Sequence, residues 1–501
     1  MANKNDFVDL IAQGYQSKGE SITLGAAMLG DETLTGSFVN IPLKTINRHG
    51  LISGATGTGK TKTLQVFAEN LSEKGIPVLL MDLKGDLSGL AKASPGHPKI
   101  DQRHEKIGFP FEAKEFPVEI LTISEQNGTR LRATVSEFGP VLLSRILGLS
   151  EVQEGILAIL FQYCDDKKLG LLDLKDLKKV LQFATQEGKA ELEESYGRIS
   201  TASTGSILRK IVALEQQGAD MFFGERSFDV KDLCRLSDDG RGIISVLRLT
   251  DVQDKPQMFS TFMLQLLAEV YNSFPELGDS DRPELVLFID EAHLVFENAS
   301  KSLLDQLESI VKLIRSKGIG IYFVTQNPKD IPSDVLSQLG LKIQHALRAF
   351  TAKDRKAIKL AAENYPDSDY YDTATVLTEL GIGEALVSAL NEKGVPTPLV
   401  KTMLRAPMSR MDVLSESELQ QLIDKSKIAG RYNEVIDSDS AYEILTEKIV
   451  RAQQREEKET KSKTSASASS RRTAMNPVLK VVTSATFIRG VFGILNKVFK
   501  K

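Results

Sequence analysis

Eight consecutive residues, Gly54–Thr61, constrain this 501-residue chain more than any other feature. They read Gly-Ala-Thr-Gly-Thr-Gly-Lys-Thr and match the pattern G-x-x-x-x-G-K-[ST] of a phosphate-binding loop, or P-loop. The apolar residues just before them predict a strand that ends at Ser53. The helical spacing of apolar residues over 62–74 predicts a helix after them. This strand, loop and helix are the context that the motif requires.

The residue types in the motif suit the phosphate groups of a nucleotide. Glycines let backbone N–H groups converge on phosphate oxygens at the N-terminus of a helix, where the dipole favours negative charge. We expect Lys60 to neutralise the β and γ phosphates and Thr61 to offer its hydroxyl to Mg²⁺. ATP and Mg²⁺ are therefore the expected cofactors. The predicted nucleotide-binding residues are Gly54, Ala55, Thr56, Gly57, Thr58, Gly59, Lys60, Thr61 and Lys62.

A second apolar run, Leu285–Ile289, ends at two acids and predicts a buried strand followed by a pair of carboxylates. Ligands of open α/β sheets bind at the carboxyl ends of the strands, so we expect these carboxylates beside the P-loop. Asp290, together with Thr61, is the predicted magnesium ligand. Glu291 is the predicted general base, which orients or deprotonates the attacking water.

Three further polar residues are candidates for catalysis. Gln326 follows the predicted strand 320–324, from where its amide would contact the γ-phosphate or the attacking water. Arg315 ends the predicted helix 302–316, and Arg348 falls in a predicted edge strand. Phosphoryl transfer develops charge on the transferred oxygens, and a neighbouring subunit can deliver an arginine to them. A surface ion pair is the alternative for either arginine.

Other polar residues near the predicted strand ends have an open role. Asp82 ends the predicted strand 78–82, and structural and functional roles are equally open for it and for the Lys84-Gly85-Asp86 segment that follows. No histidine has the spacing of a metal ligand. Packing or support of neighbouring groups is therefore expected for His49, His293 and His345.

Strands alternate with helices along most of the chain, which predicts an α/β fold with a parallel-rich central sheet. Two short strands before the core are expected at a sheet edge, and a late hairpin is expected near 385–394. The predicted parts are a lead-in at 1–45, two parts of the core at 46–136 and 234–405, a helical insertion at 137–233 between them, a helical extension at 406–450, a charged and Ser-rich linker or frayed helix at 451–475, and a basic amphipathic tail at 476–501.

Composition limits the setting in which the chain works. The formal net charge is −4, so no whole-chain basic excess announces a nucleic-acid or membrane partner. Cys164 and Cys234 form no metal or disulfide pattern, which fits a reducing compartment. The N-terminus has no signal-peptide pattern and the apolar runs are only strand-length, so we expect a cytoplasmic protein. The tail 476–501 allows three roles: docking on a neighbouring subunit, DNA binding, or peripheral contact with an anionic membrane.

Seven segments together resemble the HerA-like branch of the FtsK/HerA superfamily of RecA-type motor ATPases. The resemblance covers about residues 20–410. Many P-loop ATPases share the two phosphate-site motifs, and their conjunction with the arginine and glutamine segments is far more specific. The seven segments are Asn47–Gly50, Gly54–Thr61, Asp82–Gly85, Ile289–His293, Ile314–Gly318, Thr325–Pro328 and Gln344–Arg348.

The resemblance implies a RecA-like core and a homo-hexameric ring, with ATP sites between subunits and DNA threaded through a central pore. Arg315 best matches the position of the family's arginine finger, which acts in trans, and Gln326 matches its sensor. HerA helicases usually carry a substantial N-terminal β-barrel that docks a nuclease. Here the P-loop begins 53 residues into the chain, which argues against a nuclease partner.

Three functions compete on these grounds. The leading hypothesis is an ATP-driven ring motor that translocates on or unwinds DNA. The alternative is a protein-remodelling or secretion-type ATPase of the same superfamily, and salt-sensitive DNA binding separates the two. An assembly scaffold that hydrolyses little ATP is disfavoured, because Lys60, Thr61, Asp290 and Glu291 are all present.

Overall fold

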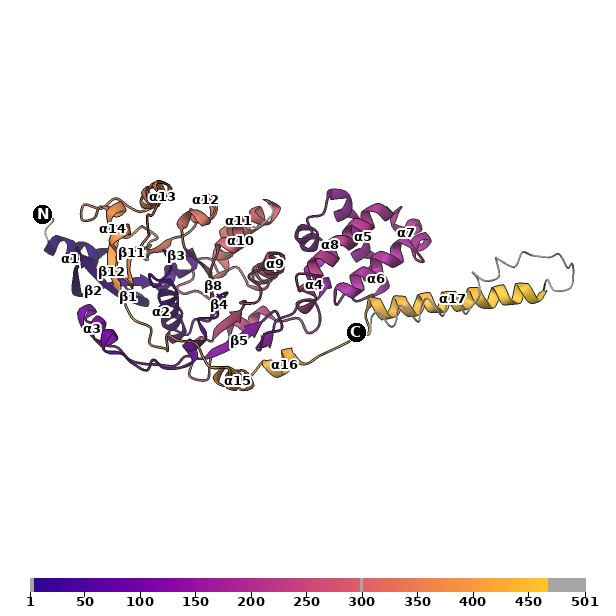
Figure 1. Ribbon diagram of the computed structural model, residues 1–501, viewed down its shortest axis with the longest axis horizontal. Coiled ribbons are helices and arrows are strands. Elements are labelled where there is room, and N and C mark those ends of the chain that lie inside the picture. Colours follow the sequence, from indigo (N-terminus) through magenta and orange to yellow (C-terminus); the bar gives the residue numbers. More distant parts are fainter. Residues whose placement is uncertain (1–3, 298–300, 467–501) are drawn as a thin grey trace. The chain divides into compact units, whose positions relative to one another are not determined.

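One mixed sheet of twelve strands organises the fold (Figure 1). The computed structural model describes residues 4–297 and 301–466. The strand order is β2-β1-β12-β11-β10-β3-β9-β8-β4-β7-β5-β6, and neighbours from β10 to β6 pair in parallel. The strands are β1 (Ser21–Leu29), β2 (Glu32–Pro42), β3 (Gly50–Ser53), β4 (Val78–Asp82), β5 (Val118–Thr122), β6 (Thr129–Arg130), β7 (Ile244–Arg248), β8 (Leu285–Ile289), β9 (Ile319–Thr325), β10 (Leu341–Gln344), β11 (Glu384–Ser388) and β12 (Val400–Leu404).

The predicted α/β class and parallel-rich sheet are confirmed, and two local predictions about edge strands are wrong. Of the two strands before the core, only β2 lies at an edge of the sheet, because β12 pairs antiparallel with β1 and covers it. Arg348 is not in a strand, because β10 ends at Gln344. β10 is also not an edge strand, since it lies inside the sheet between β3 and β11. The late hairpin is present as the antiparallel pair β11 and β12.

Several helices of the core were not expected from the sequence, and Lys4–Gly14 and Pro98–Ile107 are two examples. The first has Phe7 and Ile11 one turn apart on its buried face. The second begins with Pro98 and ends at Gly108 in a left-handed conformation, which are ordinary helix boundaries inside a segment rich in Gly, Pro and His. The core helices are α1 (Lys4–Gly14), α2 (Lys60–Glu73), α3 (Pro98–Ile107), α9 (Pro256–Ser273), α10 (His293–Glu297), α11 (Lys301–Ile314), α12 (Ser333–Leu336), α13 (Ala352–Ala362) and α14 (Thr373–Glu379).

Five further helices follow β6 and form a group of their own in Figure 1. Capping boxes begin several of them, with Thr134 and Asp173 as the capping residues of the first and third. The boundaries predicted for this insertion remain predictions. The helices are α4 (Val135–Ile146), α5 (Glu151–Lys167), α6 (Leu174–Thr185), α7 (Lys189–Tyr196) and α8 (Thr201–Glu215).

The C-terminal part is helical as far as the structure describes it. The described residues divide into two units, with the boundary after residue 442. Residues 451–466, predicted as the start of a linker or frayed helix, belong to a helix, whereas the tail 476–501 lies outside the described residues. The helices are α15 (Glu416–Asp424), α16 (Ala429–Asn433) and α17 (Ala441–Ala466).

Three aromatic rings fix the P-loop helix to the sheet. Tyr322 lies 5.2 Å from the ring of Phe67 on α2 and 5.0 Å from the ring of Phe288 on β8, between ring centroids. Tyr322 also pairs in register with Gly50 of β3, where an added Cβ would come within 2.4 Å of the tyrosine ring. The glycine therefore makes room for the aromatic group that packs between the P-loop strand and its helix.

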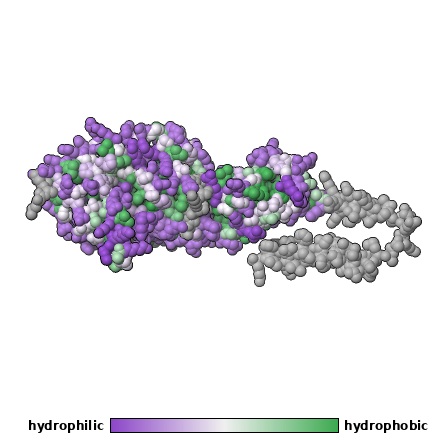
Figure 2. All heavy atoms as spheres, turned by 90° about the horizontal axis from the view of Figure 1, so that it is seen from above, coloured by the Kyte–Doolittle hydropathy of each residue, from purple (hydrophilic) through white to green (hydrophobic). Residues whose placement is uncertain are grey.

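The face of the molecule drawn in Figure 2 is mostly hydrophilic. Figure 2 shows apolar residues on the visible face as small patches among polar ones. Within the described residues, no helix is both long enough and apolar enough to cross a bilayer.

A close backbone approach at Gly25 generates a stability prediction. A Cβ at this position on β1 would lie 1.9 Å from the carbonyl oxygen of Met403 on β12. We expect Gly25→Ala to lower the free energy of unfolding by about 1–3 kcal/mol, because the two strands must separate locally. Urea unfolding followed by circular dichroism measures the change.

The matched control is Gly155→Ala in α5, where no atom lies within 4 Å of the added Cβ. That substitution should be neutral or should stabilise the protein by up to about 1 kcal/mol, because alanine favours a helix interior. Equal behaviour of the two variants would contradict the close approach of β1 and β12.

Candidate nucleotide site

The P-loop has the backbone of an open cradle. Gly54, Gly57 and Gly59 all have positive φ angles, of 150°, 79° and 114°. A Cβ at Gly57 would meet no atom within 4 Å, so space is open on that side of the loop. Such a conformation suits glycine and turns backbone N–H groups toward a ligand at the start of α2. The loop is anchored to the sheet, since Ala55 N donates to Ala346 O at 2.8 Å.

The side chain of Lys60 folds back over the loop. Its Nζ donates to the carbonyl oxygens of Gly54 at 2.7 Å and Ala55 at 3.2 Å. Burial, together with the nearby charge of Lys84, lowers the pKa of Lys60. The structure therefore holds a buried cation at the centre of the cradle, where phosphate charge would be neutralised.

The two predicted carboxylates lie at the end of β8 and differ in their surroundings. Asp290 Oδ1 accepts the N–H of Glu291 at 2.9 Å, whereas Asp290 Oδ2 is buried without a hydrogen-bond partner among the described residues. Burial raises the pKa of Asp290 to about 7. A buried oxygen with no donor is a fitting ligand for a hard cation. No group of three or more Asp, Glu, His or Cys residues in the described chain is arranged to hold a metal by itself.

Glu291 occupies an unusual backbone position. Its φ angle is +46°, in the left-handed region that non-glycine residues rarely adopt. The side chain is buried, with Oε1 paired to Lys84 and Oε2 3.2 Å from Nδ1 of His293. The rare backbone conformation and the ion pair with Lys84 thus fix the direction of this carboxylate, and the ring of His293 lies beside it.

Lys84 is a site residue to which sequence reasoning assigned no role. Burial lowers its pKa, but the hydrogen bond to Glu291 and the charge of Asp290 outweigh burial, and the pKa is raised overall. Asp82, two residues earlier, accepts N–H groups of Gly85 at 2.7 Å and Leu87 at 3.1 Å. Asp82 therefore shapes the loop that presents Lys84, and the position of both after β4 was the available signal.

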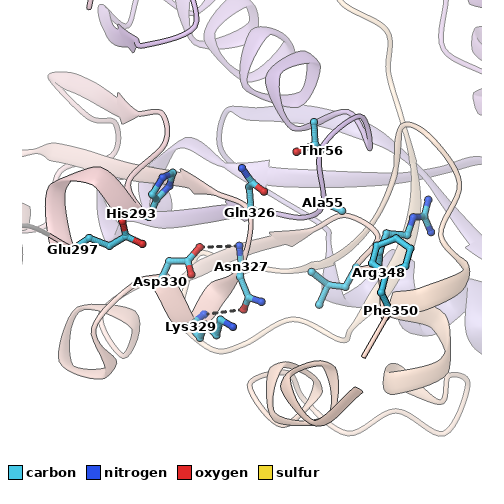
Figure 3. Close-up of a pocket in the computed structure, with 11 residues that line it drawn as sticks. Ala55, Thr56, His293, Glu297, Gln326, Asn327, Lys329, Asp330, Arg348 and Phe350 are labelled. Carbon is cyan, nitrogen blue, oxygen red and sulfur yellow. Dashed lines mark hydrogen bonds between the residues drawn. The ribbon is translucent and has the colours of Figure 1, made fainter. Parts of the chain in front are cut away.

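Two of the remaining candidates, Gln326 and Arg348, line one cavity of about 630 Å³ beside the P-loop (Figure 3). Thr56, His293, Gln326 and Arg348 contribute to its wall, and Phe350 lies next to Arg348. These residues come from the P-loop, from α10, and from the segments that follow β9 and β10. The parallel strands thus bring distant parts of the sequence to the same edge of the sheet.

The two candidate arginines lie at opposite ends of the parallel strands. Arg348 lines the cavity with Thr56, and its Nη1 donates to Thr378 O at 3.3 Å. Arg315 precedes β9 and lines a different cavity with Arg48, which precedes β3. Because the P-loop follows β3 and Gln326 follows β9, Arg315 is separated from its own P-loop by the length of the strands.

The histidines are held by neighbouring groups. Ile321 N–H donates to Nδ1 of His49 at 3.1 Å, so the other ring nitrogen carries the proton and donates to Val311 O at 2.8 Å. His345 packs on Gly54, and its Nε2 lies 2.9 Å from the hydroxyl of Thr63. Both rings are buried, and burial lowers the pKa of each to about 4.

Comparison with known proteins identifies the family. The family model described as helicase HerA-like, C-terminal, matches residues 28–490. The chain belongs to this family. This membership agrees with the resemblance in its motifs.

Relatives of this HerA-like chain include two archaeal helicases. A probable helicase of Methanocaldococcus jannaschii is 26% identical over 378 residues, which are 68% of this chain and 63% of the relative. The DNA double-strand break repair helicase HerA of Sulfolobus acidocaldarius is 22% identical over 357 residues, which are 70% of this chain and 64% of the relative. The matched region thus spans less than two thirds of the length of these relatives.

The bacterial conjugative coupling protein TrwB has a similar fold. Its solved structure superimposes with a TM-score of 0.53 and 16% identity, over 81% of this chain and 94% of TrwB. Other solved forms of TrwB contain a non-hydrolysable ATP analogue, or ADP and Mg²⁺. At this identity the likeness establishes the RecA-like fold of the HerA-like chain.

The burial of His49 generates a prediction about pH. The pKa is about 4 in the folded protein and about 6.5 in an unfolded chain, so between these values only the unfolded state binds the proton. The contribution of His49 to stability is therefore complete above pH 6.5 or so and is lost as the pH falls toward 4. Over this pH range the wild type should lose up to about 3 kcal/mol of unfolding free energy, and His49→Asn should not show this loss.

Urea unfolding at several pH values measures this difference, and asparagine tolerates the positive φ of 58° at this position. His97→Asn, which replaces an exposed histidine at a helix N-cap, is the matched control and should follow the wild-type curve. A wild-type pH profile for His49→Asn would contradict the neutral, buried state of this ring.

Proposed function

We propose that this chain hydrolyses MgATP at the P-loop and, as a ring, uses the energy to translocate on or unwind DNA. The observation that carries the proposal is the convergence of Lys60 with the adjacent pair Asp290 and Glu291, from two distant segments, on one edge of the sheet. Family membership supports the ATPase. The DNA part is supported by the relatives, because one of them is a DNA double-strand break repair helicase.

The P-loop would hold the triphosphate. The N–H groups of residues 54–62 would bind phosphate oxygens at the N-terminus of α2, and Lys60 would exchange its carbonyl contacts for the β and γ phosphates. Thr61 and the unpartnered oxygen of Asp290 would hold Mg²⁺, directly or through water. A bound Mg²⁺ supplies charge neutralisation of the phosphates, with phosphate and water oxygens completing its coordination.

Glu291 is the proposed general base. Its fixed direction next to Lys84 and His293 would orient the attacking water, and a carboxylate in this position contributes about 10²–10⁴ in rate. Gln326 lines the same cavity and would contact the γ-phosphate or the water. Lys84 would act as a positioning residue, because it holds Glu291 rather than the substrate.

The position of Arg315 supports a ring, with a homo-hexamer as the proposed assembly. Its side chain is partly exposed and lies at the sheet edge opposite the P-loop, where it is paired with Asp279 at 3.2 Å. From that edge it cannot complete its own site, whereas a neighbouring subunit can present the same edge to the P-loop. Arg348 already lies at the P-loop edge and would act within its own subunit.

The first test is ATP hydrolysis with and without single- and double-stranded DNA at low salt. We expect DNA to stimulate turnover, and Glu291→Gln to reduce it by about 100-fold or more while nucleotide still binds, because only the base is lost. The stimulation should weaken steeply with salt, since phosphate contacts release counterions.

The outcome separates the candidate functions. Robust turnover that ignores DNA would contradict the DNA motor and favour the protein-remodelling or secretion-type ATPase. Absence of turnover in the wild type under both conditions would contradict the ATPase itself. Full activity of Glu291→Gln would remove the proposed base.

Mixing of inactive subunits tests the two arginines. Arg315→Ala should reduce turnover at least 100-fold, and mixing it with Lys60→Ala subunits should restore part of the activity. Restoration is expected because an intact P-loop in the first variant meets an intact Arg315 in the second. Arg348→Ala mixed with Lys60→Ala is the control. This mixture should stay inactive, because Arg348 and Lys60 would act in the same subunit and every subunit then lacks one of them.

Recovered turnover per subunit, measured after the mixed subunits have exchanged, is the readout. No recovery in the Arg315 mixture, although mixed assemblies form, would contradict the trans role. Full activity of a strictly monomeric wild type would contradict the ring.

A further inference from the structure

An exposed isoleucine lies beside the P-loop on a closely packed turn. Ile382 is 72% exposed and precedes β11. The next residue, Gly383, donates its N–H to Thr58 O at 3.0 Å. A Cβ at Gly59 would lie only 3.3 Å from the nitrogen of Gly383, so the turn contacts the backbone of the P-loop.

Arg103 holds this turn from the other side. Its guanidinium donates to Ile382 O at 2.9 Å, Gly383 O at 3.1 Å and Leu404 O at 3.1 Å. The guanidinium also lies against Gly383, where an added Cβ would come within 3.0 Å of it. A single exposed apolar side chain is ordinary on protein surfaces. Ile382 differs because hydrogen bonds hold its backbone on both sides. Little conformational entropy of this turn is therefore lost when a ligand contacts it.

A second partly exposed apolar residue lies next to the first turn of α2. The carbonyl oxygen of Met411 accepts a hydrogen bond from Lys62 Nζ at 2.5 Å, and the preceding carbonyl, of Arg410, accepts one from Gln65 Nε2 at 2.9 Å. Lys62 lies about one helical turn beyond Thr58. The start of α2 therefore has Ile382 next to its P-loop side and Met411 next to its first turn.

We propose that Ile382 contacts the face of the nucleotide's purine base, with Met411 as a second apolar contact. This inference rests on the proposed nucleotide site: a triphosphate anchored at the N-terminus of α2 leaves its ribose and base beside that helix. The carbonyls of Ile382 and Gly383 already accept bonds from Arg103. The turn therefore offers the base an apolar surface, and burial of the ring face supplies the affinity. Arg103 is a positioning residue for this contact.

Binding of ATP and of inorganic tripolyphosphate, both with Mg²⁺, tests the inference by calorimetry in a Glu291→Gln background. Ile382→Ala should raise the Kd for ATP about fivefold, because it removes apolar contact with the base. The Kd for tripolyphosphate should not change, since the P-loop is intact. Met411→Ala should have the same selective effect with a smaller size.

Val395→Ala is the matched control. Val395 is also exposed, and it lies between β11 and β12, beyond the end of β11 that is distant from the P-loop. It should leave both Kd values unchanged.

Two results would overturn the inference while the proposed function stands. An unchanged Kd for ATP in Ile382→Ala would show that the base lies elsewhere. Equal weakening of ATP and tripolyphosphate would show that the turn acts through the P-loop and not on the base. Failure of the parent protein to bind either ligand would instead overturn the proposed function, and this inference with it.

Discussion

The burial of two adjacent carboxylates at the end of β8 is the constraint on which the rest of the site depends. Carboxylates removed from water are unfavourable unless hydrogen bonds or cations compensate them. Glu291 is compensated by Lys84 and by His293. Asp290 keeps one oxygen without a donor, and its pKa is raised to about 7. Among the described residues, Lys84 thus balances the charge of Glu291 through an ion pair, whereas no side chain donates to the free oxygen of Asp290.

The parallel sheet supplies the geometry for this arrangement. β3, β9 and β8 are neighbours, so the P-loop, Gln326 and the two acids follow three adjacent strands at one edge. The same directionality places Arg48 and Arg315, which precede their strands, at the other edge. Two arginines that looked equivalent in the sequence thus have different partners available to them. This separation is the structural reason to connect nucleotide chemistry with subunit contact.

Much of the site could be predicted because its residues are adjacent in sequence to strong local signals. Gly54–Thr61 forms a motif by itself, and Asp290 and Glu291 follow an apolar run. Other features had only a weak local signal. Lys84 belongs to the site because the loop bound by Asp82 presents it to Glu291, and Arg348 was assigned to an edge strand although β10 ends before it and lies inside the sheet. Each of these depends on which strands become neighbours.

The sequence by itself determined the P-loop, the strand ends that carry polar residues and the α/β class, because these follow from local backbone preference and from the spacing of apolar side chains. The tertiary structure decided the partners. It placed Lys84 against Glu291, separated Arg315 from Arg348, and brought Ile382 to the P-loop across more than three hundred residues of sequence. Strand order and long-range burial produce these contacts, and neither is encoded in a short segment.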